Sequence, residues 1–296
     1  MKNDVYERAL AAYLSFAVGD ALGATTEFML PREIKDKYDI HDKIIGGGWL
    51  HLKAGNVTDD TEMSLALGDS IMENGGYTVK GAADHFAKWM KKKPVDIGST
   101  VRRGIVNYLT KGSVVSLYST FSAGNGAAMR NLPVVLYCLK DWTWFEEITI
   151  SQCHITHNNE LSDMATVVLG EVMKVLLETG DKKAALDIVS EFIRKAPSFS
   201  HSKYSGEASG YIKDTFRTVM HFFFDSDNLY ETVVRTVNQG GDADTNGAIA
   251  GMLAGALYGM DGIPQRWLKA LDQDVVRLIT KQTEDLLNAP MNVILL

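Results

Sequence analysis

Residues 240–259, GGDADTNGAIAGMLAGALYG, contain the pattern that decides the fold of this chain. Glycine recurs at every fourth position from Gly247 to Gly259, and alanines lie beside it. On an α-helix these glycines form one stripe, along which a neighbouring helix can approach closely. Polar residues begin the segment, and its apolar part is too short to cross a membrane. We therefore predict a central buried helix, with the small-residue stretch 9–24 as its partner.

Helical spacing of apolar residues recurs along most of the chain, while strand-like alternation is scarce. A length of 296 residues suggests about two domains. A boundary should appear as a polar linker rich in Pro, Gly and Ser, and no such stretch stands out among the six prolines. We predict an all-α fold with a single compact multi-helix domain over residues 1–296. The predicted helices are 5–18, 60–73, 78–92, 145–152, 161–178, 182–194, 208–224, 228–237, 245–259 and 274–287.

Composition argues against several classes of protein. The net charge of −7 and the pI near 5.5 disfavour a nucleic-acid or anionic-membrane surface, because such binding uses basic residues. The N-terminal segment carries acidic residues and lacks an uninterrupted apolar core, so we expect neither a signal peptide nor a transit peptide. No apolar run reaches transmembrane length without interruption. The cytoplasm is the expected location.

Cysteine usage fits a reducing compartment. Cys138 and Cys153 cannot form a disulfide framework, and neither lies in a CxxC pair, so we expect reduced, buried thiols. His154 and His157 lie three residues apart beside Cys153, a spacing found in zinc sites. A further closing ligand is not apparent, which disfavours zinc.

Two acidic segments each precede an apolar helix, NVTDDTE at 56–62 and GGDADTN at 240–246. Helix capping would explain one oxygen in each, because Asp and Thr accept hydrogen bonds from free N–H groups at helix starts. Each segment holds more acids than a cap requires. If the aspartates converge, each pair at about 4 Å repels by roughly 4 kcal/mol at an effective dielectric near 20.

Bound cations or protonation would relieve this repulsion, and divalent cations are the simpler hypothesis at neutral pH. Carboxylate and hydroxyl oxygens, without thiolates or an imidazole cluster, select Mg²⁺ or Mn²⁺ over zinc or copper. Two ions about 3.5–4 Å apart could share carboxylates, activate a water and hold substrate oxygens. The residue chemistry therefore favours a two-metal hydrolase, and it does not identify the bond that is cleaved.

The order GDALG at 19–23, TDDT at 58–61 and GGDADT at 240–245 resembles the ADP-ribosylglycohydrolase family over essentially the whole chain. The segments GNGAAMR at 124–130 and HITHN at 154–158 are most similar to the bacterial branch that acts on ADP-ribosylated arginine. The resemblance implies an all-α fold, two Mn²⁺ or Mg²⁺ ions, and hydrolysis of the N-glycosidic bond between ADP-ribose and a protein side chain.

Carried over position by position, the resemblance assigns three sets of residues. Asp96 and Glu27 are the catalytic candidates, because guanidine must leave protonated and a carboxyl group must manage that proton. Ala243 stands where many members have threonine, which leaves the ligand positions intact. The implied metal ligands are Thr58, Asp59, Asp60, Asp242, Asp244 and Thr245. The implied substrate contacts are Gly124, Asn125, Gly126, Met129, His157 and Tyr211.

Simpler roles remain open for several of these residues. Glu27 could be an exposed loop acid, and Asp96 could cap a helix that starts near Gly98. Tyr211 could be a core aromatic residue. His157 could make a structural hydrogen bond instead of contacting the substrate.

Other functions also remain open. The site could release ADP-ribose from serine or from O-acetyl-ADP-ribose, cut the pyrophosphate, or bind ADP-ribose without catalysis. The resemblance to the bacterial branch implies the nitrogenase iron protein, modified on arginine, as the substrate. It also implies a PII signalling protein as a regulatory partner, with any membrane association being peripheral and through a partner.

Overall fold

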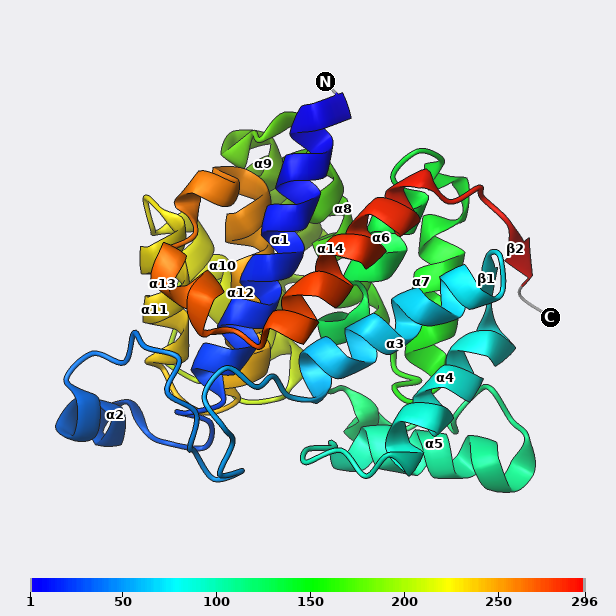
Figure 1. Cartoon of the computed structure of the whole chain (residues 1–296), viewed down its shortest axis with the longest axis horizontal. Helices are drawn as coiled ribbons and strands as arrows, with labels where there is room; N and C mark the ends of the chain where they lie inside the picture. The colour runs from blue at the N-terminus through cyan, green and yellow to red at the C-terminus, as the bar shows by residue number, and fades with distance from the viewer. Residues whose placement is uncertain (1, 295–296) are drawn as a thin grey trace.

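The computed structural model describes residues 2–294, and helices account for most of them (Figure 1). The α-helices are α1 Lys2–Gly23, α2 Pro31–Tyr38, α3 Asp59–Glu73, α4 Val79–Lys91, α5 Ser99–Lys111, α6 Leu132–Cys138, α7 Phe145–His154, α8 Glu160–Thr179, α9 Lys182–Lys195, α10 Ile212–Phe224, α11 Leu229–Val237, α12 Ala243–Tyr258, α13 Gln265–Ala270 and α14 Gln273–Asn288. Two short parallel strands, β1 Tyr77–Thr78 and β2 Val293–Ile294, join the C-terminal segment to the start of α4. The predicted all-α fold is confirmed.

Helices α1 and α12 pack side by side at the centre of the molecule (Figure 1). Their backbones touch where the stripe of small residues predicted contact. A Cβ atom added at Gly19 would lie 2.0 Å from the carbonyl oxygen of Gly247, and one added at Gly251 would lie 2.2 Å from that of Ser15. Because atoms cannot approach so closely, only glycine permits this spacing. The predicted central helix and its partner are both confirmed.

The remaining helices surround this pair and bring the two acidic helix starts together. α3 contacts α1 and α14, while α10, α11 and α8 cover α12. The N-termini of α3 and α12 therefore face the same region, although they are far apart in the sequence. α2 lies at one edge of the molecule (Figure 1).

The helix boundaries differ from the prediction in one informative place. We predicted a helix over 208–224, but α10 begins at Ile212. The preceding loop is extended because it pairs with the glycine loop: the Asn125 N–H donates to the Gly210 carbonyl at 3.1 Å, and the Ile212 N–H donates to the Ala123 carbonyl at 3.0 Å. These bonds replace the first turn of the predicted helix.

Some helices lack the periodicity that the sequence analysis used. All residues of α6 are buried, so no polar face marks its turns. α2 and α13 are short, and α13 has one buried residue, Trp267. Such helices are defined by their neighbours rather than by their own pattern.

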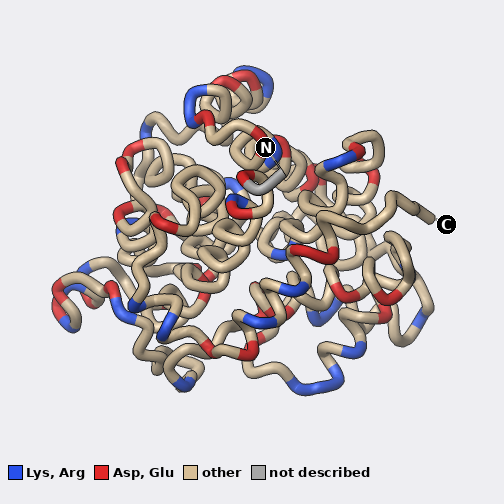
Figure 2. Tube along the Cα trace, turned by 45° about the horizontal axis from the view of Figure 1, so that its top comes forward, with Lys and Arg blue, Asp and Glu red and all other residues tan. Residues whose placement is uncertain are grey.

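Other features agree with the composition. Cys138 and Cys153 are free and buried, as predicted. Lys and Arg positions are interspersed with Asp and Glu positions over the outer part of the trace (Figure 2). Within residues 2–294, no helix has the length and apolar character needed to span a membrane.

Candidate metal centre and nucleotide cleft

The two predicted acidic helix starts meet. Thr58 is the N-cap of α3, and Asp242 is the N-cap of α12. The Thr245 hydroxyl donates to Asp60 Oδ2 at 3.1 Å, and the Thr58 hydroxyl donates to the same oxygen at 3.3 Å. Five of the six predicted metal ligands are buried, Asp242 being the partly exposed member. Helix capping therefore accounts for the position of Thr58. It does not account for the clustered aspartates, which are more numerous than capping requires.

Asp20, from α1, holds the first acidic segment in place. Its carboxylate is fully buried and accepts the backbone N–H of Thr58 at 2.9 Å and that of Thr61 at 3.1 Å, together with the Thr61 hydroxyl. Burial raises the pKa of Asp20 to about 6, although these hydrogen bonds oppose the shift. Asp20 belongs to the GDALG motif, and no role was predicted for it from the sequence. The feature that could have indicated a role for Asp20 is the presence of an acidic residue inside a stretch of small, apolar residues.

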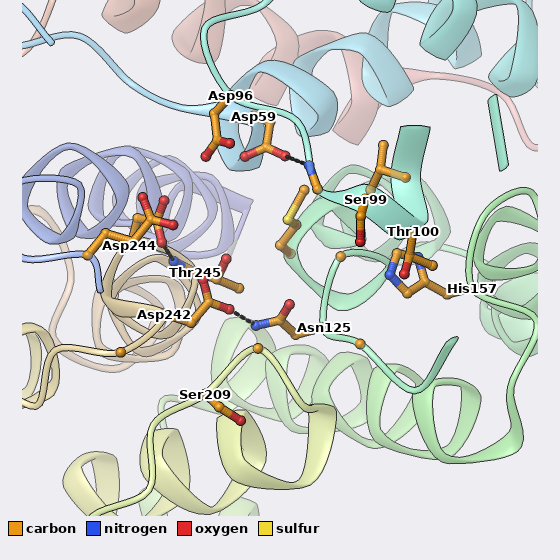
Figure 3. Close-up of a pocket in the computed structure, with 18 of the residues that line it drawn as sticks. Asp59, Asp96, Ser99, Thr100, Asn125, His157, Ser209, Asp242, Asp244 and Thr245 are labelled. Carbon is orange, nitrogen blue, oxygen red and sulfur yellow. Dashed lines mark hydrogen bonds between the residues drawn. The ribbon is translucent and has the colours of Figure 1, made fainter. Parts of the chain in front are cut away.

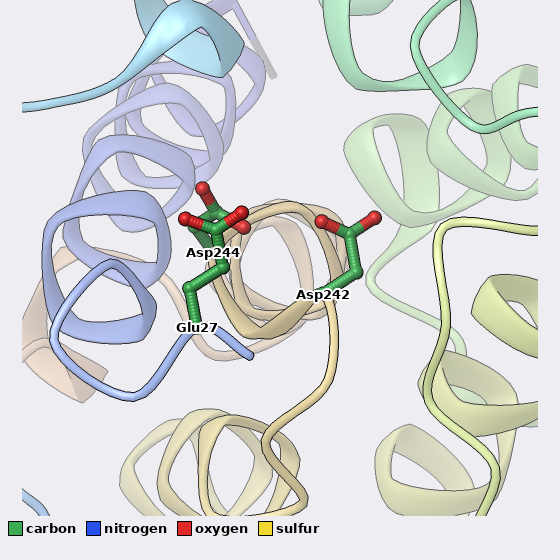
Figure 4. Close-up of side chains that lie close together, drawn as sticks. All are labelled: Glu27, Asp242 and Asp244. Carbon is green, nitrogen blue, oxygen red and sulfur yellow. The ribbon is translucent and has the colours of Figure 1, made fainter. Parts of the chain in front are cut away.

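Glu27 joins Asp242 and Asp244 in one carboxylate group. One oxygen from each of the three lies within 4.8 Å of the others (Figure 4). Backbone bonds bring the segments together: the Phe28 N–H donates to the Gly241 carbonyl at 2.7 Å, and the Gly241 N–H donates to the Met29 carbonyl at 3.0 Å. Glu27 is therefore not an exposed loop acid, because only 6% of its surface is accessible.

The electrostatics of this group suit a hard cation. Burial, together with the nearby carboxylates of Asp96, Asp242 and Asp20, raises the pKa of Glu27 to about 8. Burial and neighbouring carboxylates also raise the pKa values of Asp59, Asp60 and Asp244. Such shifts mean that negative charge here lacks compensation from the protein.

One buried oxygen supports the same conclusion. Only 1% of the surface of Asp60 is accessible to solvent, and its Oδ1 atom has no hydrogen-bond partner among the described residues. Unpaired buried polar atoms are costly, and a coordinated cation would satisfy this one. The donor set consists of carboxylate and hydroxyl oxygens, and it therefore fits a hard divalent metal. A buried acidic group that can hold metal is thus present.

A cleft of about 450 Å³ opens beside the carboxylates (Figure 3). Most predicted site residues line it. Thr58, Asp60 and Tyr211 are not among its lining residues. The predicted residues that line the cleft are Glu27, Asp59, Asp96, Gly124, Asn125, Gly126, Met129, His157, Asp242, Asp244 and Thr245. The other lining residues were not predicted from the sequence, and they include Phe28, Ser99, Thr100, Ser209 and Gly210.

The glycine loop is attached directly to the acidic group. The Asn125 side-chain amide donates to Asp242 Oδ2, and it also donates to the Thr215 hydroxyl at 2.9 Å. Tyr211 pairs by backbone with Gly124, and its side chain is 40% exposed. The core-aromatic interpretation of Tyr211 is therefore wrong. Its neighbours Ser209 and Gly210 line the cleft instead.

Asp96 lies at the mouth of the cleft beside Asp59. The capping interpretation is wrong, because the N-cap of α5 is Gly98 and no side chain caps this helix. The Gly98 N–H instead reaches Asp59 Oδ2 at 3.4 Å. Asp96 is half-buried, and this burial raises the pKa of its carboxyl group.

An aromatic pair, Trp49 and Phe28, lies next to Glu27. Trp49 Nε1 donates to Glu27 Oε2 at 2.5 Å, and the Trp49 ring lies 5.2 Å from the Phe28 ring. Trp49 is carried by a turn whose ends are joined by two bonds between Gly47 and Leu52. The indole N–H favours the ionised form of Glu27 and fixes its orientation.

The histidines do not form a zinc site. His154 Nε2 pairs with Asp163 Oδ2 at 2.8 Å, and His157 Nδ1 lies 2.8 Å from the Thr156 hydroxyl. Among the described residues, no metal-binding group includes Cys153 or either histidine.

The fold and the acidic site can now be compared with those of known protein families. The ADP-ribosylglycohydrolase family model matches residues 1–293, and the chain belongs to that family. A Rhodospirillum rubrum protein named ADP-ribosyl-[dinitrogen reductase] glycohydrolase is 48% identical over 283 residues, which cover 96% of each chain. The ADP-ribosylarginine hydrolase Tri1 of Pseudomonas putida is 31% identical over 280 residues, or 89% of this chain and 74% of that protein.

The fold comparison agrees. A solved structure described as an ADP-ribosylglycohydrolase-related protein complex matches with a TM-score of 0.84 and 30% identity. The match covers 95% of this chain and 99% of that chain. The family assignment made from the sequence motifs is therefore confirmed.

Proposed function

We propose that this chain removes ADP-ribose from a modified arginine side chain by hydrolysing the N-glycosidic bond. The observation that carries the proposal is the buried group of Glu27, Asp242 and Asp244 at the edge of a cleft large enough for part of a nucleotide. The family match, and the name of the Pseudomonas putida relative, which specifies ADP-ribosylarginine, support the choice of bond.

Two Mn²⁺ or Mg²⁺ ions are the proposed cofactors. Thr58, Asp59, Asp60, Asp242, Asp244 and Thr245 would hold them, and Glu27 lies close enough to join or border this set. When bound, such ions supply positive charge that lowers the pKa of a water molecule and orients ribose hydroxyls. The unpaired Asp60 oxygen and the raised carboxyl pKa values support this assignment.

Asp96 and Glu27 are the proposed proton-transfer residues. Guanidine is too basic to leave without a proton, so a carboxyl group with a raised pKa is suited to deliver or relay one. Both groups line the cleft, and burial raises the pKa of each. The glycine loop Gly124–Gly126, with Met129 and His157, forms the opposite wall and would hold the ADP-ribose. Tyr211, more exposed, would contact its outer end.

The natural substrate is proposed by relationship. The Rhodospirillum rubrum relative acts, by its name, on ADP-ribosylated dinitrogen reductase, so an arginine of the nitrogenase iron protein is the proposed target. A PII signalling protein as regulator, and peripheral association with a membrane through a partner, stay predictions from the resemblance.

A direct assay tests this function. The protein should be incubated with arginine-linked, serine-linked and O-acetyl ADP-ribose in the presence of Mn²⁺, with the products identified by mass. We expect intact ADP-ribose, released much faster from arginine than from serine. AMP and ribose phosphate would indicate pyrophosphate cleavage. Binding of ADP-ribose without turnover of any substrate would indicate a non-catalytic protein.

A further inference from the structure

A buried arginine lies behind the glycine loop. Arg130 is fully buried, and its guanidinium lies 4.4 Å from the centre of the Phe86 ring. Its hydrogen-bond partners are neutral: Nε donates to Gln152 Oε1 at 2.8 Å, and Nη2 donates to the Gln152 carbonyl at 2.9 Å and to Thr156 Oγ1 at 2.8 Å. Burial lowers the pKa of Arg130 to about 10, so the group remains charged near neutrality.

These contacts fix the direction of the next hydrogen bond. A guanidinium can only donate, so Thr156 Oγ1 accepts from Arg130. The Thr156 hydroxyl hydrogen then needs an acceptor of its own, because this side chain is 2% exposed and an unpaired buried donor is costly. Within the described residues, that acceptor is His157 Nδ1 at 2.8 Å. An Nδ1 that accepts carries no hydrogen, which places the imidazole hydrogen on Nε2.

The Nε2 side of this ring faces the glycine loop and the cleft. A Cβ atom added at Gly124 would lie 3.1 Å from Nε2, and one added at Gly126 would lie 2.7 Å from Cε1 of the same ring. Figure 3 shows His157 among the residues that line the cleft. Nε2 has no hydrogen-bond partner in the described part of the chain. Burial and the charges of Arg130 and Arg103 lower the pKa of His157 to about 3, which keeps the ring neutral.

We propose that Arg130 and Thr156 are positioning residues that hold His157 as the neutral Nε2–H tautomer, so that this ring presents a hydrogen-bond donor to the bound nucleotide. The proposal rests on the proposed function, in which the cleft receives ADP-ribose. An Nε2–H can bond only to an acceptor atom of the nucleotide, such as a phosphate oxygen, whereas an unprotonated Nε2 could not donate to such an atom. The buried arginine therefore acts through a relay rather than by direct contact.

Histidine ¹⁵N NMR tests the tautomer directly. The full chain is labelled on histidine and studied with Mg²⁺, and the His157 signals are assigned by their loss in His157→Gln. We expect a protonated, pyrrole-like Nε2 and an unprotonated, pyridine-like Nδ1 between about pH 5 and 8, the range in which an ordinary histidine titrates. Protonation on Nδ1, or an imidazolium in this range, would overturn the proposal.

Variants at Thr156 separate positioning from packing. Thr156→Val keeps the shape but removes the hydroxyl, so His157 should populate both tautomers and ADP-ribose affinity should fall by about tenfold. Thr156→Ser is the matched control, and it should keep the wild-type tautomer and affinity. If Thr156→Val lowers only the melting temperature and leaves the tautomer unchanged, Thr156 is merely structural and the proposal fails.

Addition of ADP-ribose distinguishes this proposal from the proposed function. We expect ADP-ribose to shift the His157 Nε2–H signals of the wild-type protein. If ADP-ribose binds without affecting them, the donor role is wrong while the proposed function stands. If ADP-ribose does not bind, both the proposed function and the donor role fail, and the tautomer measurement still decides whether Arg130 and Thr156 orient the ring.

Discussion

The Thr245 hydroxyl donates a hydrogen bond of 3.1 Å to Oδ2 of Asp60, which lies 185 positions earlier in the chain. This bond joins the first turn of α12 to the first turn of α3. It uses one oxygen of the Asp60 carboxylate and leaves the other, Oδ1, buried without a partner in the described residues. A cation bound at Oδ1 of Asp60 would therefore satisfy the one carboxylate oxygen that neither threonine contacts.

Metal titration should find two hard divalent ions per chain. The reason is the number of buried carboxylates, which exceeds what one ion can neutralise. Isothermal titration calorimetry with Mn²⁺ on chelator-treated protein measures the stoichiometry, and anomalous scattering locates the ions. A single tightly held zinc ion with Cys153 or His157 as ligand would contradict this assignment.

Asp242→Asn should weaken metal binding by about 100-fold or more, with activity that excess Mn²⁺ partly restores. The substitution preserves the size of the side chain but removes the charge that a cation needs. Calorimetry and turnover at several Mn²⁺ concentrations measure the two effects. Asp187→Asn, an exposed position on α9, is the control and should change neither. Equal metal affinity in the wild type and Asp242→Asn would remove Asp242 from the ligand set.

Asp96→Asn should behave differently. Asparagine keeps size and polarity but cannot accept or deliver the proton, so metal and ADP-ribose should still bind while turnover falls by roughly 10²-fold or more. Single-turnover rates show the loss, and excess Mn²⁺ should not rescue it. If added Mn²⁺ does restore activity, Asp96 belongs to the coordination shell, and Glu27 becomes the better candidate for proton transfer.

Gly251→Ala should destabilise the fold by about 1–3 kcal/mol or more, because the new methyl group would overlap the Ser15 carbonyl 2.2 Å away. Urea unfolding of the metal-free protein measures the loss. Gly98→Ala is the control, since its Cβ would lie an ordinary 3.8 Å from Val101 Cγ2. Equal stability of the two variants would show that α1 and α12 can separate without cost.

The central helix pair could be predicted because its cause is local. A glycine at every fourth position creates a groove whatever surrounds it, and the density of acids at 58–60 and 242–244 exceeds what capping needs. Both patterns depend on side chains close in the sequence, and the structure confirms the convergence of the two helix starts.

The contact between Trp49 and Glu27 could not be predicted in this way. It depends on a turn that packs against distant backbone: a Cβ atom added at Gly48 would lie 2.2 Å from the Ala24 carbonyl oxygen. The late start of α10 has the same origin, because the bond from the Ile212 N–H to Ala123 is tertiary. Periodicity within a segment carries no information about such partners.

The metal-free protein should lose stability as the pH rises from about 5 to 8. Burial raises the pKa of Asp20 from 3.8 to about 6 and that of Glu27 from 4.5 to about 8. A raised pKa means that the folded state holds protons that the unfolded state releases. This contribution is fully present below pH 4 and is lost as the pH passes about 6 for Asp20 and about 8 for Glu27.

Divalent metal should reverse that trend, because it binds the ionised carboxylates. Melting temperatures at pH 6 and pH 8, with chelator or with excess Mn²⁺, measure the effect, and the increase caused by Mn²⁺ should be larger at pH 8. Glu27→Gln tests the origin: it removes one titrating carboxyl group, so the metal-free variant should lose less stability than the wild type over the same interval. A metal-free wild type that becomes more stable from pH 6 to pH 8 would show that these carboxyl groups are already ionised and that the protein compensates their charge. Their pKa values would then no longer support bound cations.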